Sequence, residues 1–492
     1  MDELTALETL TGLKAYRWQC RLFSDFITGK IPDDLDVPTG LGKTSVIGIW
    51  LAARALGSPV PRRLVYIVDR RAVVDQASSE AERLANNLAK TLNGAIAPQV
   101  ADQWRANLGL NSERLPISTL RGQFADNRMW LENPARSAIV VGTVDMIGSR
   151  MLFEGYGVGT RMRPVHAALI ANDTLVVLDE AHLVPPFQEL VHAVTRFRRP
   201  TPVPAMRVLA LSATGSVREN ESVFRIGLGD ESEETRVADR LKAPKRLLLQ
   251  ETGNLAQSLA DRAFQLGEGG HRVLIFCNSR DKLARVVAEE LGKRSAKVWK
   301  DMPTTALLVG ARRVAERESL AGRRGPDGVA WEIEPDPVFR RFTPSEIQEP
   351  TENPAFLVAT SAGEVGVDLD ADHMVCDLVA WERMVQRLGR VNRSGRTEPA
   401  MVDVFAAVQD FFRFTYGQST CSKSYLPCFE QAQIFMFSLQ CRRAPLCGKR
   451  SDDHERDSGL IQKVFGIAPE SVLTTSPELC SVSFSASCLL HV

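Results

Sequence analysis

A glycine-rich run near the N-terminus carries the residue types that hold the phosphates of a nucleotide. Residues 37–44 read Val-Pro-Thr-Gly-Leu-Gly-Lys-Thr, after a short expected strand at 35–37 and before an apolar helix expected at 45–55. In such a loop backbone N–H groups curl around phosphate oxygens, the lysine reaches the β- and γ-phosphates, and the threonine hydroxyl ligates Mg²⁺. The dipole of the following helix adds to anion binding. The predicted phosphate-binding residues are Thr39, Gly40, Gly42, Lys43 and Thr44, with Thr44 as a magnesium ligand.

Two adjacent carboxylates, Asp179 and Glu180, directly follow the apolar run at 175–178. A carboxylate at the C-terminal end of a buried strand can hold Mg²⁺, and the next one can polarise the attacking water. Such a pair can also be a solvated turn or a helix cap, but the phosphate loop upstream favours the catalytic interpretation. The sequence therefore predicts Asp179 as a metal ligand and Glu180 as the base in nucleotide hydrolysis.

A basic segment at 386–396 offers several side chains that can donate hydrogen bonds to phosphate. It is expected to form a short helix and reads Gln-Arg-Leu-Gly-Arg-Val-Asn-Arg-Ser-Gly-Arg. Arginines that neutralise a transferring γ-phosphoryl group raise rates by ~10³–10⁵. From these residues alone, a solvated basic face is an equal alternative. The candidate catalytic residues are Gln386, Arg390 and Arg393. A further small hydroxyl-bearing run at 212–214 either bonds to His182 or caps a helix.

The segments that must position these residues are short apolar runs of three to five residues without alternation. Such runs are typical of strands that are buried on both faces, as in parallel sheets. Helical patterns, for example at 72–88 and 281–291, separate several of them. This alternation predicts the α/β class with doubly wound parallel sheets. The runs lie at 64–68, 138–141, 175–178 and 208–211, and then at 273–276, 355–358, 374–376 and 401–405.

A charged, weakly apolar stretch at 229–245 separates the two sets of runs. We therefore expect one α/β domain at 1–240 and a second at 241–407, with an insertion at about 302–350 that is rich in Pro, Gly and Arg. After residue 420 six of the nine cysteines crowd together, in spacings that match no paired zinc knuckle. We expect 408–492 to be an irregular, divergent tail.

Composition excludes several classes of protein. The 492 residues carry 60 Lys+Arg and 60 Asp+Glu, so the net charge gives no overall attraction to nucleic acid or membranes. An apolar fraction of 44% and a charged fraction of 24% exclude a mostly disordered or fibrous chain. No apolar run approaches the ~18 residues of a membrane span, and the scarcity of cysteine before the tail suits a reducing cytoplasm. We therefore expect a cytoplasmic location and no membrane partner.

The phosphate loop, the carboxylate pair, the run at 212–214 and the basic segment follow one another in the order of the motifs of superfamily 2 helicases. The resemblance extends across about residues 10–405. Gln19 lies where that family places its adenine-reading glutamine, whose amide offers both a donor and an acceptor. The resemblance implies two RecA-like domains that bind ATP and Mg²⁺ between them. The second domain would supply Gly366, Asp368, Gln386, Arg390 and Arg393. The matching segments are 39–44, 179–182, 212–214, 273–278, 360–368 and 386–396.

Finer features are similar to the CRISPR-associated helicase of type I interference systems. The segments that carry this similarity are 364–369, 377–380 and 386–393. Two others, 66–76 and 307–317, resemble the subtype (type I-U/I-G-like) in which the nuclease follows the helicase. The resemblance implies ATP-driven 3′→5′ translocation on single-stranded DNA and recruitment by an RNA-guided surveillance complex, in defence against foreign DNA. Because the strand should be held through its phosphates, the predicted contacts are Arg71, Arg121, Thr143 and Thr360.

One departure from that family is large. Its metal nuclease needs clustered histidines and adjacent His-Asp pairs, and none of the seven histidines here is followed by Asp. We therefore expect this chain to lack the nuclease and to work with a separate one, and we interpret 408–492 as a replaced or out-of-frame C-terminus. Two alternatives stay open: another superfamily 2 translocase, acting on RNA or within a restriction complex, and a truncated, non-enzymatic remnant that binds DNA or a partner.

Overall fold

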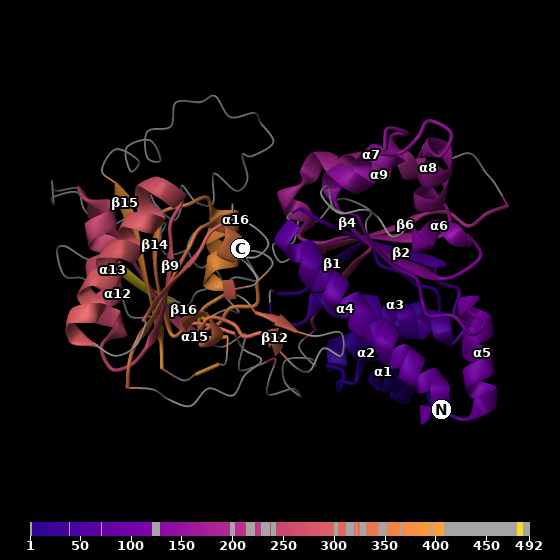
Figure 1. Ribbon diagram of the computed structural model, residues 1–492, viewed down its shortest axis with the longest axis horizontal. Coiled ribbons are helices and arrows are strands. Elements are labelled where there is room, and N and C mark those ends of the chain that lie inside the picture. The colour runs from indigo at the N-terminus through magenta and orange to yellow at the C-terminus, as the bar shows by residue number, and fades with distance from the viewer. Residues whose placement is uncertain are drawn as a thin grey trace, which may run out of the picture. The chain divides into compact units, whose positions relative to one another are not determined.

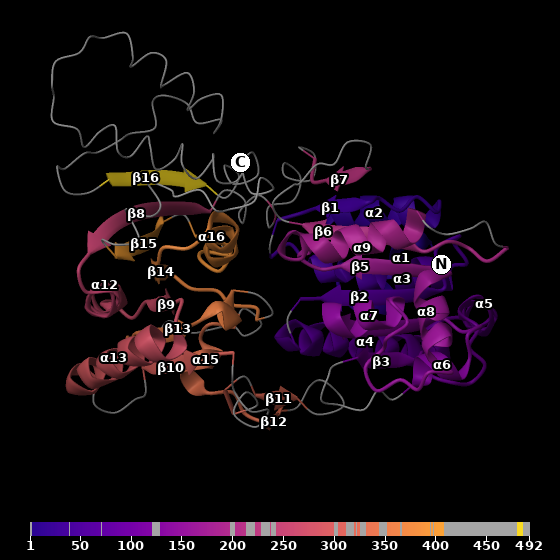
Figure 2. The same cartoon turned by 90° about the horizontal axis from the view of Figure 1, so that it is seen from above.

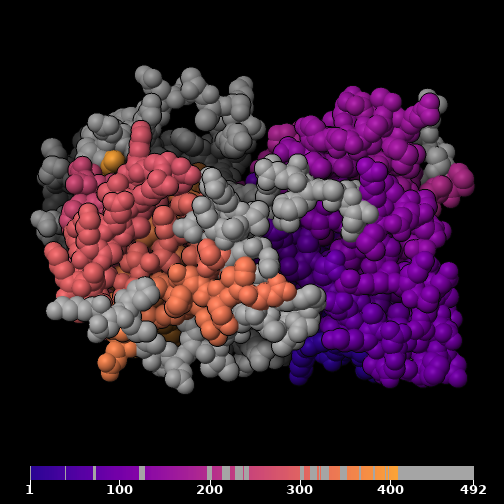
Figure 3. All heavy atoms as spheres, viewed as in Figure 1, coloured from indigo at the N-terminus to yellow at the C-terminus, as the bar shows by residue number. Residues whose placement is uncertain are grey.

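The computed structural model divides the chain into two compact units, Met1–Val237 and Ala238–Val492. Each unit is built around a sheet (Figure 1), and the first is coloured indigo to magenta and the second red to orange in the space-filling view (Figure 3). The residues that the structure describes are 2–38, 40–69, 71–120, 128–196, 202–212, 222–227, 237, 243–299, 304–310, 319–320, 322–324, 331–343, 352–364, 367–393, 395–396, 398–407 and 480–485.

The described strands of the first unit form one parallel sheet in the order β3-β4-β2-β5-β6-β1-β7, which Figure 2 shows from above. Its strands are β1 Asp34–Asp36, β2 Arg63–Val68, β3 Ile117–Leu120, β4 Ala138–Thr143, β5 Thr174–Leu178, β6 Arg207–Ser212 and β7 Val223–Arg225. The four apolar runs expected to be strands lie within β2, β4, β5 and β6, so the prediction of a parallel α/β sheet is confirmed here. Every residue of β2, β4 and β5 is buried, which explains why those runs do not alternate.

Helices cover both faces of this sheet (Figure 1), with α7, α8 and α9 on one face and α1, α2 and α3 on the other. The α-helices are α1 Glu3–Thr11, α2 Arg17–Ile27, α3 Val46–Ala55, α4 Arg71–Lys90, α5 Pro98–Leu108, α6 Met129–Glu132, α7 Val144–Met151, α8 Arg163–Ala171 and α9 Pro185–Arg196. Shorter helical turns are η1 Lys43–Ser45, η2 Thr91–Ala95 and η3 Ala181–Leu183. The helices expected at 45–55 and 72–88 correspond to η1 with α3 and to α4.

The second unit repeats the architecture with the strand order β10-β13-β9-β14-β15-β8-β16 (Figure 2). Its strands are β8 Pro244–Thr252, β9 Arg272–Phe276, β10 Thr305–Leu308, β13 Ala355–Ala359, β14 His373–Asp377, β15 Ala400–Ala407 and β16 Cys480–Ser485, and β11 Arg323–Arg324 pairs separately with β12 Trp331–Ile333. The helical elements are α12 Leu255–Gly267, η4 Arg280–Ala284, α13 Arg285–Val298, α15 Pro337–Arg340, η5 Ser361–Gly363 and α16 Trp381–Leu388. All described pairings in this sheet are parallel except that of β16 with β8.

Three parts of the second unit differ from the sequence-based expectation. β10 and α15 fall within the expected insertion at 302–350, yet β10 pairs with β13 and α15 contributes buried Val338 and Phe339 to the core. β8 was missed because its apolar run has only three residues, Leu247–Leu249, and charged residues lie on both sides of it. The third is β16, a strand within the tail that we expected to be irregular. Its sequence alternates Ser with Cys, Val and Phe, which is a strand pattern, and it adds to the open edge of β8. The rest of 408–492 lies outside the described residues.

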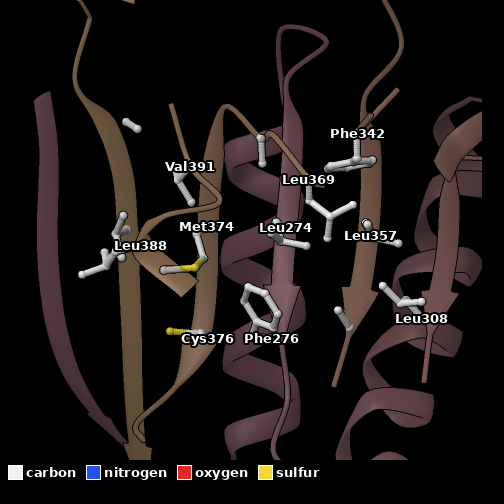
Figure 4. Close-up of a cluster of buried hydrophobic side chains, with 14 of the residues drawn as sticks. Leu274, Phe276, Leu308, Phe342, Leu357, Leu369, Met374, Cys376, Leu388 and Val391 are labelled. Carbon is white, nitrogen blue, oxygen red and sulfur yellow. The ribbon is translucent and has the colours of Figure 1, made fainter. Parts of the chain in front are cut away.

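The core of the second unit lies on both faces of its sheet. Alternate residues of β9 enter two clusters: Leu274 and Phe276 join one, and Val273 and Ile275 join the other. Figure 4 shows the first cluster, with Leu274 and Phe276 beside Met374 of the neighbouring strand. Full burial of each such side chain contributes about 1.5–3 kcal/mol. The doubly covered sheet therefore fixes the strand ends that carry the polar residues described below.

None of the described helices combines the length and the apolar character that crossing a bilayer requires.

Candidate functional site

The phosphate loop joins β1 to η1 and α3, and two of its glycines adopt left-handed conformations. Gly40 has φ 88° and Gly42 has φ 81°, a region that glycine enters without the steric cost of a Cβ. A Cβ at Gly42 would also lie 3.4 Å from Nε2 of Gln19. The predicted loop thus has its expected place after a strand and before a buried helix. Thr39 lies outside the described residues.

Lys43 and Glu180 lie together where two strands end. The Lys43 Nζ donates to Glu180 Oε1 at 2.9 Å, and the two side chains are only 7% and 11% exposed. The second oxygen, Oε2, lies 3.6 Å from Nδ1 of His182. Glu180 has φ 48°, an uncommon conformation for a non-glycine residue that turns the chain sharply after β5. The lysine and the predicted base therefore form one buried ion pair.

Tyr66, a residue that the sequence does not single out, is buried on β2 beside β5, and the charge of Asp179 acts on its hydroxyl. Burial raises the pKa of Asp179, and the charge of Glu180 raises it further, while Lys43 and the Tyr66 hydroxyl act in the opposite direction. Burial also raises the pKa of Tyr66 well above its ordinary value, so its hydroxyl stays neutral.

The side chains of Asp179 and Thr44 offer two oxygen ligands, which fits a magnesium ion that is shared with phosphate. Mg²⁺ takes six oxygen ligands and in nucleotide sites uses one or two protein groups, with phosphates and waters completing the shell. Thr44 and Asp179 are the chain neighbours of Lys43 and Glu180, whose side chains are bonded to each other, so a hydroxyl and a carboxylate are available at one place. Within the described part of the chain, no group of three or more His, Cys, Asp or Glu side chains could hold a metal ion without such help.

Gln19 lies on α2 against the phosphate loop and is 9% exposed. Its Nε2 donates to Oγ of Ser45 at 2.9 Å, and its Oε1 accepts the N–H of Tyr16 at 2.8 Å. A primary amide has two N–H groups and two acceptor lone pairs, so these bonds leave one N–H and one lone pair for an acceptor and a donor on the edge of an adenine. The position is compatible with the predicted role, which stays a prediction.

The candidate residues of the second unit lie on α16 and just after it. The guanidinium of Arg390 donates to the backbone oxygen of Glu364 at 2.9 Å and lies 3.9 Å from Asp368. The guanidinium of Arg393 pairs with Asp368 and donates to the oxygen of Leu369 at 3.2 Å. Gln386 is 2% exposed. The structure therefore brings Asp368, Arg390 and Arg393 together, while Gly366 lies outside the described residues.

Arg387 is a site residue that the candidate set omitted. Its side chain is wholly buried and donates to the carboxylates of Glu364 at 2.8 Å and Asp377 at 3.0 Å. The guanidinium also lies 5.1 Å from the ring centroid of Phe276. No local pattern in the sequence points to this role, because Glu364 and Asp377 lie 23 and 10 residues away from Arg387 along the chain.

The predicted nucleic-acid contacts have mixed outcomes. Thr143 is 7% exposed, and its hydroxyl caps α7 by accepting the N–H of Met146 at 3.4 Å. Thr360 precedes η5 and is 8% exposed. Arg71 begins α4, but its side chain is not described, and Arg121 lies outside the described residues. The structure thus gives Thr143 a local structural role and leaves contact with DNA as a prediction.

The third predicted segment, at 212–214, is described only in part. Ser212 ends β6, is 5% exposed, and its backbone oxygen accepts the N–H of Val37 at 3.3 Å. It therefore joins the strand end to the start of the phosphate loop. Ala213 and Thr214 lie outside the described residues, as do the cysteines at 421–447 and His454.

Comparison with known families gives the class of the two units. Residues 19–223 match the model of the DEAD/DEAH box helicases, and residues 269–396 match the model of the C-terminal part of the CRISPR-associated nuclease/helicase Cas3. None of the curated proteins matches the chain. The first unit is therefore similar to the DEAD/DEAH box helicases over residues 19–223. The second unit is Cas3-like, which confirms the resemblance at this level, while the subtype stays a prediction.

Solved structures show the same fold at low sequence identity. The DUF1998 helicase MrfA, bound to DNA and AMPPNP, has a TM-score of 0.54 and 14% identity, over 98% of this chain and 61% of its own. The Mycobacterium smegmatis helicase Lhr, bound to ssDNA and AMP-PNP, has a TM-score of 0.50 and 16% identity, over 82% of this chain and 48% of its own. S. cerevisiae Dbp5, bound to RNA and ADP BeF3, has a TM-score of 0.50 and 13% identity, over 88% of this chain and 97% of its own.

The likeness to MrfA supports a tandem of two RecA-like units with parallel sheets, the predicted fold class. The present chain spans about half of the Lhr chain and 61% of the MrfA chain. Helicases of the DEAD/DEAH box type hydrolyse ATP, and the residues around Lys43 are those that such an activity needs.

Proposed function

We propose that this chain is an ATP- and Mg²⁺-dependent motor that translocates along single-stranded DNA and unwinds it during CRISPR interference. The order of the two matching family models, a helicase followed by a Cas3 C-terminal part, supports this proposal. The single observation that carries it is the convergence of Lys43, Asp179 and Glu180 at the ends of β1 and β5.

The chemistry of the first unit follows from how Lys43 and Glu180 are paired. When bound, ATP with Mg²⁺ supplies a γ-phosphoryl group that water can attack. Lys43 exchanges Glu180 for the β- and γ-phosphates, and the Glu180 carboxylate then orients the water and accepts its proton. Asp179 and Thr44 hold the magnesium ion, and Gln19 contacts the adenine edge.

In the second unit, we assign charge neutralisation to Arg390 and Arg393. Both guanidinium groups already gather at Asp368, so they form a local concentration of positive charge. In the proposed reaction, these arginines stabilise the charge that develops on the transferring phosphoryl group. Gln386 assists by orienting the water, and Gly366 and Asp368 contact the nucleotide.

The nucleic-acid substrate is the feature that separates this proposal from its main alternative, an RNA helicase or restriction-type motor. We expect single-stranded DNA to stimulate ATP hydrolysis more than RNA of the same length, with contacts from Arg71, Arg121, Thr143 and Thr360. Stimulation should fall steeply with added salt, because phosphate contacts release counterions. Lys43→Ala, which removes the phosphate-binding ammonium, is the control that defines the background. Equal or stronger stimulation by RNA would favour the alternative.

The described ATP-site residues bear on the second alternative, a non-enzymatic remnant. Lys43, Thr44, Asp179 and Glu180 all have the residue types and neighbours that hydrolysis requires. An inactive remnant is under no pressure to keep four such groups together. Wild-type protein that binds DNA but turns over no ATP would restore this alternative.

We also propose that residues 1–492 move on DNA without cutting it, and that an RNA-guided surveillance complex recruits them together with a separate nuclease. The described histidines, at positions 166, 182, 192, 271 and 373, belong to no metal-binding group of three or more ligands. Circular single-stranded DNA should therefore stay intact with ATP and Mg²⁺, Mn²⁺, Co²⁺ or Ni²⁺. Nicking that survives Lys43→Ala and disappears on deletion of 408–492 would contradict this.

A further inference from the structure

The carboxylate of Glu364 accepts three hydrogen bonds from arginines of α16. It follows η5 and its side chain is 1% exposed. Arg383 donates to it from two nitrogens, with Nη2 at 2.7 Å from Oε1 and Nε at 3.0 Å from Oε2. Arg387 adds a third bond, from Nε to Oε1 at 2.8 Å. One buried carboxylate thus holds two guanidinium groups of α16.

The backbone of the same residue holds the next arginine along the chain. The oxygen of Glu364 accepts from Nη2 and Nε of Arg390 at 2.9 and 3.3 Å. Beyond it, the backbone N–H of Arg393 donates to Asp370 at 2.9 Å, and its guanidinium donates to the oxygen of Leu369. The residues that follow α16 are therefore hydrogen-bonded to the described residues of the segment that begins at Glu364.

The electrostatics make this anchor a permanent anion at neutral pH. Burial opposes ionisation of Glu364, but hydrogen bonds and charge from Arg383 and Arg387 more than offset it and hold the pKa of the carboxyl below its ordinary value. Arg387 is wholly buried, so it cannot replace Glu364 with water. Charge-assisted bonds of this kind are short and about twice as strong as neutral ones.

We propose that Glu364 is a positioning residue for Arg390 and Arg393. Its carboxylate fixes α16 through Arg383 and Arg387, and its backbone oxygen fixes the Arg390 side chain directly. Glu364 itself faces no substrate, because both of its carboxylate oxygens are occupied by these arginines. The inference rests on the proposed function, since it has meaning only if Arg390 and Arg393 act on the transferring phosphoryl group.

Glu364→Gln tests this anchor with almost no change in shape. The amide loses the negative charge and turns an N–H₂ group toward a guanidinium. A misplacement of about 1 Å can cost 10²-fold in rate, so we expect kcat for ATP hydrolysis to fall about 10- to 100-fold. KM for ATP should stay within about threefold, because the arginines act mainly in the transition state. Glu364→Asp, which keeps the charge, should recover part of kcat.

Asp403→Asn is the matched control for a merely structural effect. Asp403 is another wholly buried carboxylate of the same unit, on β15, and its partners are Arg262 at 3.0 Å and Gln250 at 3.2 Å. The substitution should lower the thermal stability of the second unit while leaving kcat of the folded protein unchanged. Equal losses of kcat in Asp403→Asn and Glu364→Gln would overturn the positioning role.

Arg383→Gln gives a second route that does not depend on the folding of a core variant. The Arg383 side chain is 33% exposed. We expect the substitution to lower kcat about three- to tenfold. Arg294→Gln is its control, since Arg294 is 25% exposed and also pairs with two carboxylates, Asp261 and Glu290. It should leave kcat unchanged.

The outcomes distinguish the inference from the function beneath it. Active wild type, a strong loss in Arg390→Ala and unchanged kcat in Glu364→Gln and Arg383→Gln would overturn the positioning role alone. Wild-type protein without ATP hydrolysis would overturn the proposed function and this inference with it.

Discussion

The charged groups of the two units are held in opposite ways. In the first unit the phosphate-binding Lys43 and the predicted base Glu180 pair with each other, through a single bond of 2.9 Å. In the second unit Arg383 and Arg387 are held by Glu364 and Asp377, and we assign none of these four residues to chemistry. The first arrangement can exchange partners when a nucleotide enters, whereas the second can only keep its geometry. The comparison separates a site that must rearrange from one that must not.

The largest effect should come from breaking the pair in the first unit. Glu180→Gln should lower ATP turnover to less than about a tenth of wild type, because the amide cannot accept the proton of the attacking water. ATP should still bind, since Asp179 and Thr44 remain for magnesium and Lys43 loses only an internal competitor. Steady-state hydrolysis and binding of a fluorescent ATP analogue measure the two quantities. Turnover above a tenth of wild type would exclude Glu180 as the base.

The next effect concerns the arginines that the second unit holds in place. Arg390→Ala and Arg393→Ala should each lower kcat by at least about 10²-fold, near the lower end of what such arginines contribute. ATP affinity should change much less, because the charge they neutralise grows toward the transition state. Affinity and turnover that fall by the same factor would make both residues simple binding groups.

A third effect tests the rigidity of the second unit directly. Arg387→Met leaves the buried carboxylates of Glu364 and Asp377 without this partner, and breaking such a buried pair costs about 3–5 kcal/mol. Arg294→Met removes a partly exposed ion pair and should cost only about 0–1 kcal/mol. Hydrogen exchange of the β9 and β14 amides measures both. Similar losses in the two variants would show that the Arg387 network contributes no special stability.

The smallest effect is a pH dependence of stability in the second unit. His373 accepts the N–H of Met401 at Nδ1, and burial, followed by the charge of neighbouring His271, lowers the pKa of His373 to about 4. The unfolded chain binds this proton at about pH 6.5. Stability is therefore present at pH 7 and is lost as the pH falls from about 6.5 toward 4. We expect a loss on the order of 1 kcal/mol between pH 7 and pH 5.

Urea unfolding of the wild type and of His373→Asn at the two pH values checks this. The amide oxygen of Asn can accept the Met401 bond without titrating, so the variant should lose the pH slope. Asp372, whose pKa Arg272 helps to hold at about 2 against the opposing effect of burial, titrates below this window. An unchanged slope in the variant would assign the effect to another group.

Much of the fold was predictable because strands buried on both faces leave apolar runs that need no partner to be recognised. The phosphate loop and Asp179-Glu180 were predictable for a similar reason, since each chemical role is carried by a short contiguous segment. Arg387 and Tyr66 were not, because each acts through contacts with residues far away in the sequence. β8 was missed because its three leucines stand between charged and polar residues, and β10 because it lies in a stretch rich in Pro, Gly and Arg that indicates an insertion.

The doubly covered sheets also bear on how far such a sequence can drift. Replacing one apolar core residue by another of similar volume lowers the free energy of unfolding by less than about 1.5 kcal/mol. The buried strands therefore constrain the volume of their side chains and not the residue type. The polar residues that follow the strands are different, because Lys43 or Glu180 has no substitute of the same shape and charge. A chain built in this way can share only 14% of its residues with MrfA and still keep the same fold. Relatives of this protein are therefore better sought by the strand-end residues than by overall identity.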